Sequence, residues 1–514
     1  MTNEPFYVTT PIYYVNDEPH LGHAYTTVLA DVLARYARLW GRETFFLTGT
    51  DEHGWKVERA AQSHNVSTQA QADAMVVRFQ EAWQRLYIEP DDFIRTTEPR
   101  HRRVVQAVLQ QLWEQGDIYQ DDYTGWYCVP DERFWTEKDV VDGNCPDCGR
   151  PVEQLAERNY FFRMSRYQSW LIATIEENPN FIRPATRRNE VLGFLQKPLG
   201  DLCISRPVAR LNWGIPLPFD PNYVTYVWFD ALLNYVTAPG YLQDEERFAR
   251  LWPQVLHLIG KDILITHSVY WPTMLHAAGL PLPRQIFAHG WWIMGEEKMS
   301  KSLGNVVKPL DLADKYGVDA FRYFLLREMT LGRDTNFSES GLAQRYHGNL
   351  ANNLGNLLHR LTHMIARYCD GQLPAPGTPS PLDTALRRRA EELIPAVRVL
   401  VEALALNQAL ADVVEFAGEI NRYLEQTAPW ELAKAGDRER LATVLYTAAE
   451  ALRIAAVLLA PVLPERMALL WQRLGWQAPM QLADGLGWGE LQPGAVVGRG
   501  APLFPRLDEV TEPA

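Results

Sequence analysis

The chain has 514 residues, 47% of them hydrophobic and 22% charged, which is ordinary for a folded protein of about two to four domains. The net charge of −13 argues against diffuse binding of nucleic acid, so such a partner would need local basic patches on an acidic body. The sequence lacks both a run of about 18 apolar residues and a secretory signal, and its five cysteines do not form a disulfide framework, which together favour the cytoplasm.

The first 115 residues predict the start of a nucleotide-binding sheet. Phe6–Thr9 is typical of a buried strand, and residues 20–40 place apolar side chains at helical spacing before Gly41, a natural cap. Glu43–Leu47 then predicts a second strand. A doubly wound sheet begins in this way, with a phosphate-binding turn between the first strand and the helix. Further helices are expected at residues 56–64, 68–87 and 100–115.

The middle of the chain predicts an interruption of this sheet. Periodicity breaks up over residues 116–225, where cysteines, short strands and two helical pieces indicate an insertion between two halves of the fold. Alternation resumes downstream, with a strand at Val255–Ile259, a helix at Ser268–Ala278 and a strand at Gln285–Ala288. Residues 226–337 are therefore expected to complete the nucleotide-binding fold.

The last third of the chain predicts a separate helical domain. Between residues 338 and 480 the pattern is helical and rich in alanine and leucine, apart from a Pro/Gly-rich loop at 372–381. The predicted fold class is therefore α/β, a Rossmann-type doubly wound parallel sheet with an insertion, followed by an all-α helical bundle and an extended tail. The expected division runs 1–115, 116–225, 226–337, 338–480 and 481–514.

Two motifs far apart in the sequence offer the groups that a nucleoside triphosphate needs. His20 and His23 lie on one face of the first turn of a predicted helix, where free N–H groups and the positive dipole end attract phosphate. Gly22 between them lets a ligand approach the backbone. Lys298 and Lys301 belong to a Ser/Gly-rich loop and supply mobile positive charges. The alternatives are a helix that the histidines merely cap and a solvated basic turn.

Both motifs are similar to the signature sequences of class I aminoacyl-tRNA synthetases, and further segments resemble the methionyl-tRNA synthetase family over essentially the whole chain. These segments are Pro11–Asn16, Thr48–Gly54, Tyr226–Ala231, Gly260–Ser268 and His289–Trp291. The resemblance implies a ligase that joins methionine to tRNA(Met), including initiator tRNA. Methionine and ATP, accompanied by Mg, would give methionyl-adenylate and pyrophosphate before transfer to the 3′ adenosine.

The resemblance also implies which residues bind each substrate. The ATP-binding residues would be His20, Gly22, His23, Gly260, Asp262, His289, Gly290, Trp291, Lys298, Met299, Ser300, Lys301 and Ser302. The catalytic residues among them would be His20, His23, Lys298 and Lys301. The methionine-binding residues would be Pro11, Ile12, Tyr14, Asp51, Trp228, Ala231, Tyr235, Asp262, Ile263 and His267. Such a site works by positioning and charge stabilisation rather than by covalent chemistry.

The residues themselves agree with a methionine site. A methionine side chain suits an apolar slot with an aromatic rim, and its ammonium needs a carboxylate, which Asp51 at a strand end can supply. Taken singly, Trp228 and Tyr235 are more often core residues than ligand contacts. A metal site at Asp51–His53 is another interpretation, but neighbouring side chains of a strand diverge.

A cysteine cluster in the insertion implies a zinc knuckle by the same resemblance. The family often pairs two Cys-x-x-Cys motifs, whereas the first half here ends in aspartate, as Cys128-Val-Pro-Asp131. Because carboxylate oxygen also binds zinc, the expected ligands of one structural zinc are Cys128, Asp131, Cys145 and Cys148. The alternative is a degraded knuckle that holds no metal.

Asn349 and Trp430 of the helical domain match the anticodon-reading positions of the family, and Asn353 stands at a third such position. An exposed tryptophan can stack on an unpaired base, and an asparagine amide can bond the edge of a base. The family commonly has arginine at the position of Asn353, which weakens that assignment, and Trp430 could instead pack inward. The chain stops without room for a C-terminal dimerisation module, so a monomer is expected.

Two other functions fit parts of the same pattern. The leucine, isoleucine and valine synthetases share both signatures, but they usually carry an editing insertion longer than residues 116–225. The cysteine synthetase would use its zinc to bind the substrate thiolate. A catalytically inactive tRNA-binding paralogue is the remaining alternative, and the intact His20, His23, Lys298 and Lys301 argue against it.

Overall fold

The computed structural model describes residues 4–128, 133–135, 137, 140–146, 149–294, 297–298, 307–478 and 482–507. It contains two compact units. The sheet unit comprises residues 1–19, 44–82 and 89–289, and the helical unit comprises residues 20–43, 83–88 and 290–514. The helix that begins at the histidine motif therefore belongs to the same unit as the helical bundle.

The sheet unit is built around a seven-stranded sheet in the described part of the chain, and every pairing in it is parallel. β1 lies between β3 and β13, β4 and β2 also pair with β3, and β14 and β8 continue the sheet beyond β13. These strands are β1 (Phe6–Thr9), β2 (Tyr13–Tyr14), β3 (Thr44–Asp51), β4 (Asp92–Arg95), β8 (Ile182–Arg183), β13 (Val255–Gly260) and β14 (Gln285–His289). The order reverses at β1, as in the doubly wound sheet that the sequence predicts.

Strand β3 is longer than its apolar run. The apolar run ends at Leu47, but the strand continues to Asp51, as the interpretation of Asp51 as a strand-end carboxylate expects, because β4 pairs with its second half. A Cβ atom at Gly49 would lie 2.0 Å from the carbonyl oxygen of Ile94, so a glycine is required for β4 to approach this closely. The extension carries Asp51 to the carboxyl end of the sheet.

One buried apolar cluster joins this sheet to its flanking helices. Leu109 of α4 and Trp271 of α10 pack in the same cluster as Val255 of β13. Helix α4 buries residues 101, 104, 105, 108, 109 and 112, which is the spacing of one helical face. The helices are α2 (Trp55–His64), α3 (Thr68–Arg85), α4 (Pro99–Glu114), α5 (Gln168–Glu177), α6 (Ala185–Phe194), α7 (Val227–Leu232), α8 (Asn234–Thr237), α9 (Glu245–Leu251) and α10 (Trp271–Ala277).

Residues 116–225 form two smaller sheets and also extend the main one. The described strands make a four-stranded antiparallel sheet, in the order β6-β5-β7-β9, and a three-stranded one, in the order β10-β12-β11. The sequence predicts a separate insertion here, yet β8 pairs with β14 at the edge of the main sheet. The other strands are β5 (Ile118–Cys128), β6 (Arg133–Trp135), β7 (Glu153–Phe162), β9 (Leu202–Cys203), β10 (Ser205–Pro207), β11 (Pro216–Leu217) and β12 (Asp220–Thr225).

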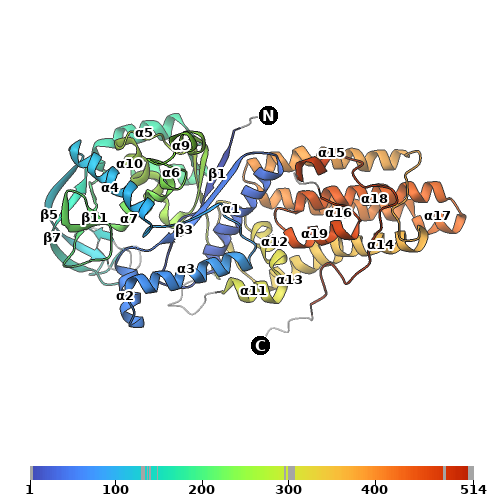
Figure 1. Cartoon of the computed structure of the whole chain (residues 1–514), viewed down its shortest axis with the longest axis horizontal. Helices are drawn as coiled ribbons and strands as arrows, with labels where there is room; N and C mark the ends of the chain where they lie inside the picture. The colour runs from blue at the N-terminus through green and yellow to red at the C-terminus, as the bar shows by residue number, and fades with distance from the viewer. Residues whose placement is uncertain are drawn as a thin grey trace. The chain divides into compact units, whose positions relative to one another are not determined.

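The helical unit contains α1 and a bundle formed by the last third of the chain. Figure 1 shows α15, α16 and α18 side by side. The described residues from 338 to 478 hold helices and no strand, as the sequence predicts. The elements of this unit are α1 (Leu21–Leu39), β15 (Trp292–Met294), β16 (Glu297–Lys298), α11 (Pro309–Tyr316), α12 (Val318–Glu328), β17 (Thr335–Asn336), α13 (Glu339–Arg345), α14 (Asn356–Tyr368), α15 (Pro381–Glu402), α16 (Leu406–Thr427), α17 (Pro429–Ala435), α18 (Arg438–Leu459) and α19 (Pro464–Arg473).

Helix α18 is the core helix of this bundle. Among the described residues it is the one helix that is long and apolar enough to cross a membrane by length and composition alone. However, 94% of its most apolar stretch is buried inside the protein. A helix that is apolar all round is expected at the centre of a bundle, and the burial assigns α18 to that position.

A buried arginine fastens four segments of the helical unit. The guanidinium of Arg322, on α12, is fully buried and donates to the carboxylate of Asp31 on α1 at 2.6 Å. Its remaining N–H groups donate at 3.0–3.3 Å to the carbonyl oxygens of Leu86, Tyr87, Pro461 and Val462. All five guanidinium N–H groups are therefore bonded, as the burial of such a charge requires.

Candidate active site

The candidate residues of the sheet unit gather where parallel strands end. Asp51 is the last residue of β3, Gly260 is the last residue of β13 and His289 is the last residue of β14, and residues 261–267 follow β13 at once. Pro11 and Ile12 follow β1 in the same way. Ligands of doubly wound sheets bind at the carboxyl ends of the strands, so these candidate residues lie at a suitable edge.

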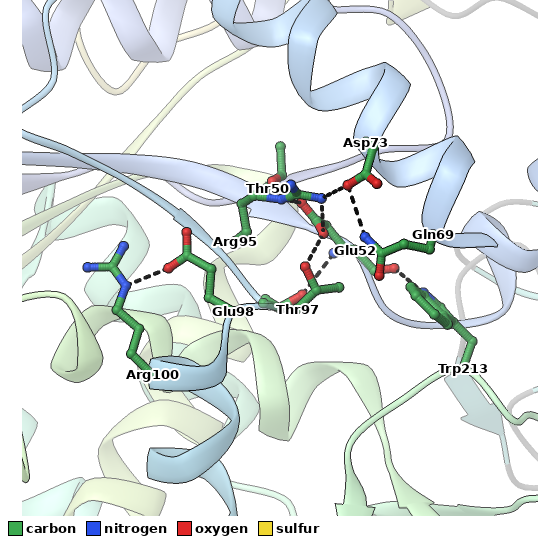
Figure 2. A network of polar contacts seen from close by, with 10 residues as sticks. Thr50, Glu52, Gln69, Asp73, Arg95, Thr97, Glu98, Arg100 and Trp213 are labelled. Atoms are coloured by element: carbon green, nitrogen blue, oxygen red, sulfur yellow. Dashed lines mark hydrogen bonds and ion pairs between the residues drawn. The ribbon is translucent and has the colours of Figure 1, made fainter. Parts of the chain in front are cut away.

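Asp51, Glu52 and His53 point to different partners at the end of β3. Figure 2 shows Glu52 bound to Arg95, whose Nε and Nη2 donate to the carboxylate at 2.6 and 3.0 Å. His53 Nδ1 instead lies 2.5 Å from the carboxylate of Asp230. The described residues contain no group of three or more His, Cys, Asp or Glu side chains that could hold a metal ion. Asp51 is buried, with 3% exposure, and the divergence leaves it apart from the other two.

His267 and Tyr235 form a buried hydrogen-bonded pair. The Nδ1 of His267 lies 3.0 Å from the carbonyl oxygen of Ile263, so Nδ1 carries the hydrogen and Nε2 accepts from the Tyr235 hydroxyl at 2.9 Å. Burial lowers the pKa of His267 to about 4, and burial also raises the pKa of the Tyr235 phenol. Both side chains are therefore neutral at pH 7, which suits an uncharged ligand side chain.

The other residues expected to bind methionine include aromatic and apolar side chains. Tyr14 and Trp228 are half-buried and meet edge to face, with ring centroids 6.4 Å apart. Ile12 and Ile263 are also half-buried, and Ala231 is buried. These side chains are of the kind that an apolar slot with an aromatic rim requires.

Gly260 and Asp262 shape the end of β13. A Cβ atom at Gly260 would lie 2.5 Å from the Oδ1 of Asp262, so glycine leaves the room that this carboxylate occupies. Asp262 is exposed, and its negative charge partly offsets the fall in the pKa of His267 that burial causes. Asp262 therefore acts electrostatically on the tyrosine–histidine pair.

The histidine motif caps its own helix in the helical unit. His20 is the N-cap of α1, where the Gly22 N–H donates to His20 Nδ1 at 3.0 Å and the His20 N–H donates to His23 Nδ1 at 3.4 Å. The two rings stack with their centroids 3.6 Å apart. Because Nδ1 accepts, a neutral ring carries its hydrogen on Nε2 and presents an Nε2–H donor. Capping and phosphate binding are thus compatible roles for these histidines.

A pair of short antiparallel strands leads into the lysine motif. Gly290 and Trp291 precede β15, and the Trp291 N–H donates to Asp334 at 2.9 Å. Lys298, the last residue of β16, pairs with Ile293 of β15. The other residues of the motif, Met299, Ser300, Lys301 and Ser302, lie outside the described part of the chain.

Two of the four expected zinc ligands lie in one small cluster. Cys128 and Cys145 are 0% and 2% exposed and pack with Val152. Two buried thiols from separate segments fit a tetrahedral site of soft ligands. Asp131 and Cys148 lie outside the described residues.

Asn349 and Asn353 line one pocket of the helical unit, and Trp430 does not belong to its lining. The pocket has a volume of about 400 Å³ and is also lined by Arg327 and Arg422. Both asparagines belong to a π-helical stretch, Tyr346–Gly355, a rare conformation that often marks functional sites.

The two asparagines differ in their hydrogen bonds. Asn353 Nδ2 donates to the carbonyl of Val414 at 2.8 Å, and Asn353 Oδ1 accepts from Asn421 at 3.1 Å. The Oδ1 of Asn349 is buried and has no hydrogen-bond partner among the described residues. Trp430 is half-buried in the first turn of α17. Asn349 is therefore the asparagine with an acceptor to offer a ligand.

Some polar residues near these sites are not predicted by the sequence. Arg327 and Arg422 come from α12 and α16, and folding alone brings them to the asparagine pocket. His53 and His101 meet Asp230 in the same way. Asp230 is a carboxylate inside the apolar helix α7, and that is a signal which the sequence does carry.

Two family models match the chain. The model described as class I tRNA synthetases (M) matches residues 6–156 and 150–362. The model of the anticodon binding domain of methionyl tRNA ligase matches residues 373–509. Together the two models cover residues 6–362 and 373–509, which include nearly all of both units.

Individual proteins agree with these models. A methionine–tRNA ligase of Caldanaerobacter subterraneus subsp. tengcongensis is 47% identical over 505 residues, which cover 98% of this chain and 79% of the relative. That of Streptomyces coelicolor is 45% identical, with 98% and 97% covered. The solved structure of Mycobacterium tuberculosis methionyl-tRNA synthetase in complex with methionyl-adenylate has a TM-score of 0.94 and 43% identity, covering 98% of this chain and 100% of that one. The chain therefore belongs to the class I methionyl-tRNA synthetase family.

Proposed function

We propose residue roles in the reaction of this family, which is ATP-dependent activation of L-methionine to methionyl-adenylate and transfer to the 3′ adenosine of tRNA(Met), including initiator tRNA. The observation that carries the proposal is a buried carboxylate, Asp51, and a neutral Tyr235–His267 pair at the carboxyl edge of one parallel sheet. Synthetases for other amino acids and an inactive paralogue are not favoured, because the relatives named above are methionine–tRNA ligases.

Methionine binding follows from the chemistry of these side chains. Asp51 binds the ammonium group, because a buried carboxylate gains most from a charged hydrogen-bond donor. Tyr14 and Trp228 supply aromatic surface, on which a thioether sulfur makes favourable contacts. The Tyr235–His267 pair is neutral, so it places no buried charge beside a thioether, which could not pair with one.

Activation is in-line attack of a methionine carboxylate oxygen on the α-phosphorus of ATP. The bond to the β-phosphate breaks, and pyrophosphate leaves. His20 and His23 donate Nε2–H groups to phosphate oxygens as charge builds, while Lys298 and Lys301 hold the β- and γ-phosphates. A Mg ion bound with ATP would neutralise further phosphate charge.

The experiment that tests these roles is Lys301→Ala in methionine-dependent ATP–pyrophosphate exchange. The rate should fall by about two orders of magnitude or more, with little change in the KM for methionine, because the lysine acts mainly in the transition state. Lys197→Ala, which removes an exposed lysine, is the matched control. Near-normal exchange in the Lys301 variant would overturn the assignment.

We further propose one structural zinc bound by Cys128, Asp131, Cys145 and Cys148, and the two buried thiols of one cluster support it. Protein purified without chelator should contain close to one zinc per chain. Because structural zinc contributes folding energy, Cys145→Ser should make residues 116–225 more sensitive to protease than the main sheet, and Cys369→Ser should not. Zinc-free protein would contradict this proposal.

In the helical unit, we propose that Asn349, Asn353 and Trp430 meet the anticodon within an anticodon-binding domain at residues 338–480. The buried acceptor of Asn349 supports a base contact, and Arg327 and Arg422 supply the positive charge that an acidic protein needs locally for RNA. Asn353 would shape this surface through its hydrogen bonds to α16. It lacks the positive charge of the arginine that the family commonly has at this position.

We also propose that the chain acts as a cytoplasmic monomer, divided at residues 115, 225, 337 and 480 as the sequence predicts. Light scattering after size-exclusion chromatography should give a mass near 58.8 kDa. A mass twice as large would contradict the monomer.

A further inference from the structure

A buried carboxylate bridges two histidines that have no role in the reaction described above. Asp230 Oδ2 lies 2.5 Å from His53 Nδ1, and Asp230 Oδ1 lies 2.8 Å from His101 Nε2. The three side chains are between 0% and 5% exposed. Three separate elements supply them: the residues after β3, helix α4 and helix α7. We call these residues the His–Asp–His triad.

The carboxylate of the triad is ionised. Burial alone would raise the pKa of Asp230, but the charge and hydrogen bonds of His53 and His101 hold it at about 2. A buried carboxylate of this kind needs its donors fixed in place, because water cannot replace them. The triad is therefore a rigid point within the sheet unit.

This rigid point links two segments that carry candidate methionine-binding residues. His53 stands two residues after Asp51 in the sequence, and Asp230 stands two residues after Trp228. Movement of the strand end relative to α7 would break the 2.5 Å contact between His53 and Asp230. Asp51 and Trp228 are thus held in one arrangement through their neighbours.

The backbone beside His53 is held from a second direction. Figure 2 shows Trp213 Nε1 donating to the carbonyl of Glu52 at 2.5 Å, while the Glu52 carboxylate is bound by Arg95. The ring of Trp213 also lies against His53, with centroids 5.8 Å apart. Because the end of β3 is fixed in this way, the bond from His53 to Asp230 ties α7 to a fixed point.

We propose that His53, Asp230 and His101 are positioning residues, which keep the Asp51 carboxylate and the Trp228 ring at the separation that methionine requires. The proposal rests on the assignment of Asp51 and Trp228 to methionine in the proposed function. The triad acts through those two residues and does not touch the reacting atoms. Its loss should therefore raise the KM for methionine and leave the KM for ATP unchanged.

The test compares His101→Asn with His101→Gln in methionine-dependent ATP–pyrophosphate exchange. A glutamine amide can take the place of the imidazole Nε2 and still donate to Asp230, whereas asparagine is one carbon too short. We expect the KM for methionine to rise about tenfold or more in His101→Asn, and most of this rise to be absent in His101→Gln. The KM for ATP should stay constant in both variants.

The second histidine gives the opposite order of variants. His53 bonds Asp230 through Nδ1, which an asparagine amide can replace and a glutamine amide overshoots. His53→Asn should therefore retain the KM for methionine, and His53→Gln should raise it. This reversal is a signature that a general loss of stability would not produce, and it remains measurable if one His101 variant fails to fold.

Two further variants separate the possible outcomes. Leu112→Ala removes a fully buried side chain about three turns along the same helix, so it should lower the melting temperature with a normal KM for methionine. A lower melting temperature with a normal KM for methionine in both His101→Asn and His53→Gln would show that the triad only supports the core, and would overturn the proposal. Asp51→Asn, measured in parallel, tests the methionine-binding role of Asp51 itself. If the KM for methionine rises in this variant but in none of the triad variants, the positioning role of the triad is refuted. If the KM for methionine is unchanged in Asp51→Asn, both the binding role of Asp51 and the positioning role are refuted.

Discussion

Buried ionic groups serve different ends in the two units of this protein. In the sheet unit, Asp230 and Glu52 bind partners beside residues that we assign to methionine. In the helical unit, Arg322 binds main-chain carbonyls and the carboxylate of Asp31 from other segments. Arg453 binds carbonyls of the tail segment and the carboxylate of Glu450 on its own helix. A buried charge thus points to a binding site only where its neighbours in the sequence reach a ligand-binding edge.

The pair of Arg453 and Glu450 shows the structural use most clearly. Arg453, on α18, donates to the carbonyls of Gly485 and Gly487, and Glu450 accepts the N–H groups of Gly489 and Leu491. Both side chains are fully buried. These contacts fasten the segment after α19 to the core helix of the bundle, and they leave no group directed to a ligand.

Removal of the buried guanidinium of Arg322 should strongly destabilise the helical unit. Arg322→Met should lower the free energy of unfolding by about 3–5 kcal/mol, because Asp31 and four carbonyl oxygens lose their buried donor. Guanidinium-induced unfolding measures this change, and Arg388→Ala, whose side chain is 74% exposed, is the control. Unchanged stability together with lost exchange activity would break the comparison, because Arg322 would then serve the reaction.

A smaller effect concerns pH in the sheet unit. Since the pKa of His267 is about 4 in the folded protein and near 6.5 in the unfolded chain, the unfolded chain takes up the proton first as the pH falls. Stability should therefore be unaffected above about pH 6.5 and fall by about 2–3 kcal/mol between pH 6.5 and 4. His267→Asn should lose less stability than the wild type over this range. Parallel pH profiles of the two proteins would show that His267 is not the buried neutral group described here.

Trp430 is half-buried, so it could either stack on an anticodon base or pack in the core of the bundle. Trp430→Ala should reduce kcat/KM for tRNA aminoacylation roughly 5- to 150-fold, because stacking on a base contributes about 1–3 kcal/mol, and should leave ATP–pyrophosphate exchange intact. Trp430→Phe should restore part of the loss. If Trp430→Ala instead lowers thermal stability and both activities together, the half-buried ring belongs to the core, and the anticodon must be read elsewhere.

The sequence predicts local patterns well in this protein. The strands predicted at Phe6–Thr9 and Gln285–Ala288 form as β1 and β14, and helix α1 and the helical last third also form where apolar spacing and turn residues within short windows predict them. The two signature motifs likewise depend on a few adjacent residues.

Features that depend on distant pairing could not be predicted in this way. The continuation of β3 beyond the apolar run that ends at Leu47 requires β4, and the strand β8 requires β14. The π-helical stretches Thr266–Tyr270 and Tyr346–Gly355 have no sequence signal that we can identify, although they carry His267 and Asn349. The partners of Asp230 lie 177 and 129 residues away along the chain, so a lone buried aspartate was the only local sign of them.

If the polar groups of the sheet unit serve methionine rather than stability, Asp51→Asn should separate activity from folding. In methionine-dependent ATP–pyrophosphate exchange, kcat/KM for methionine should fall roughly 30-fold or more, because the ammonium loses a buried charged partner. In chemical unfolding of the same preparation, the midpoint should hardly move. A protein that unfolds more easily and still activates methionine at the wild-type rate would contradict this assignment of the polar groups to methionine.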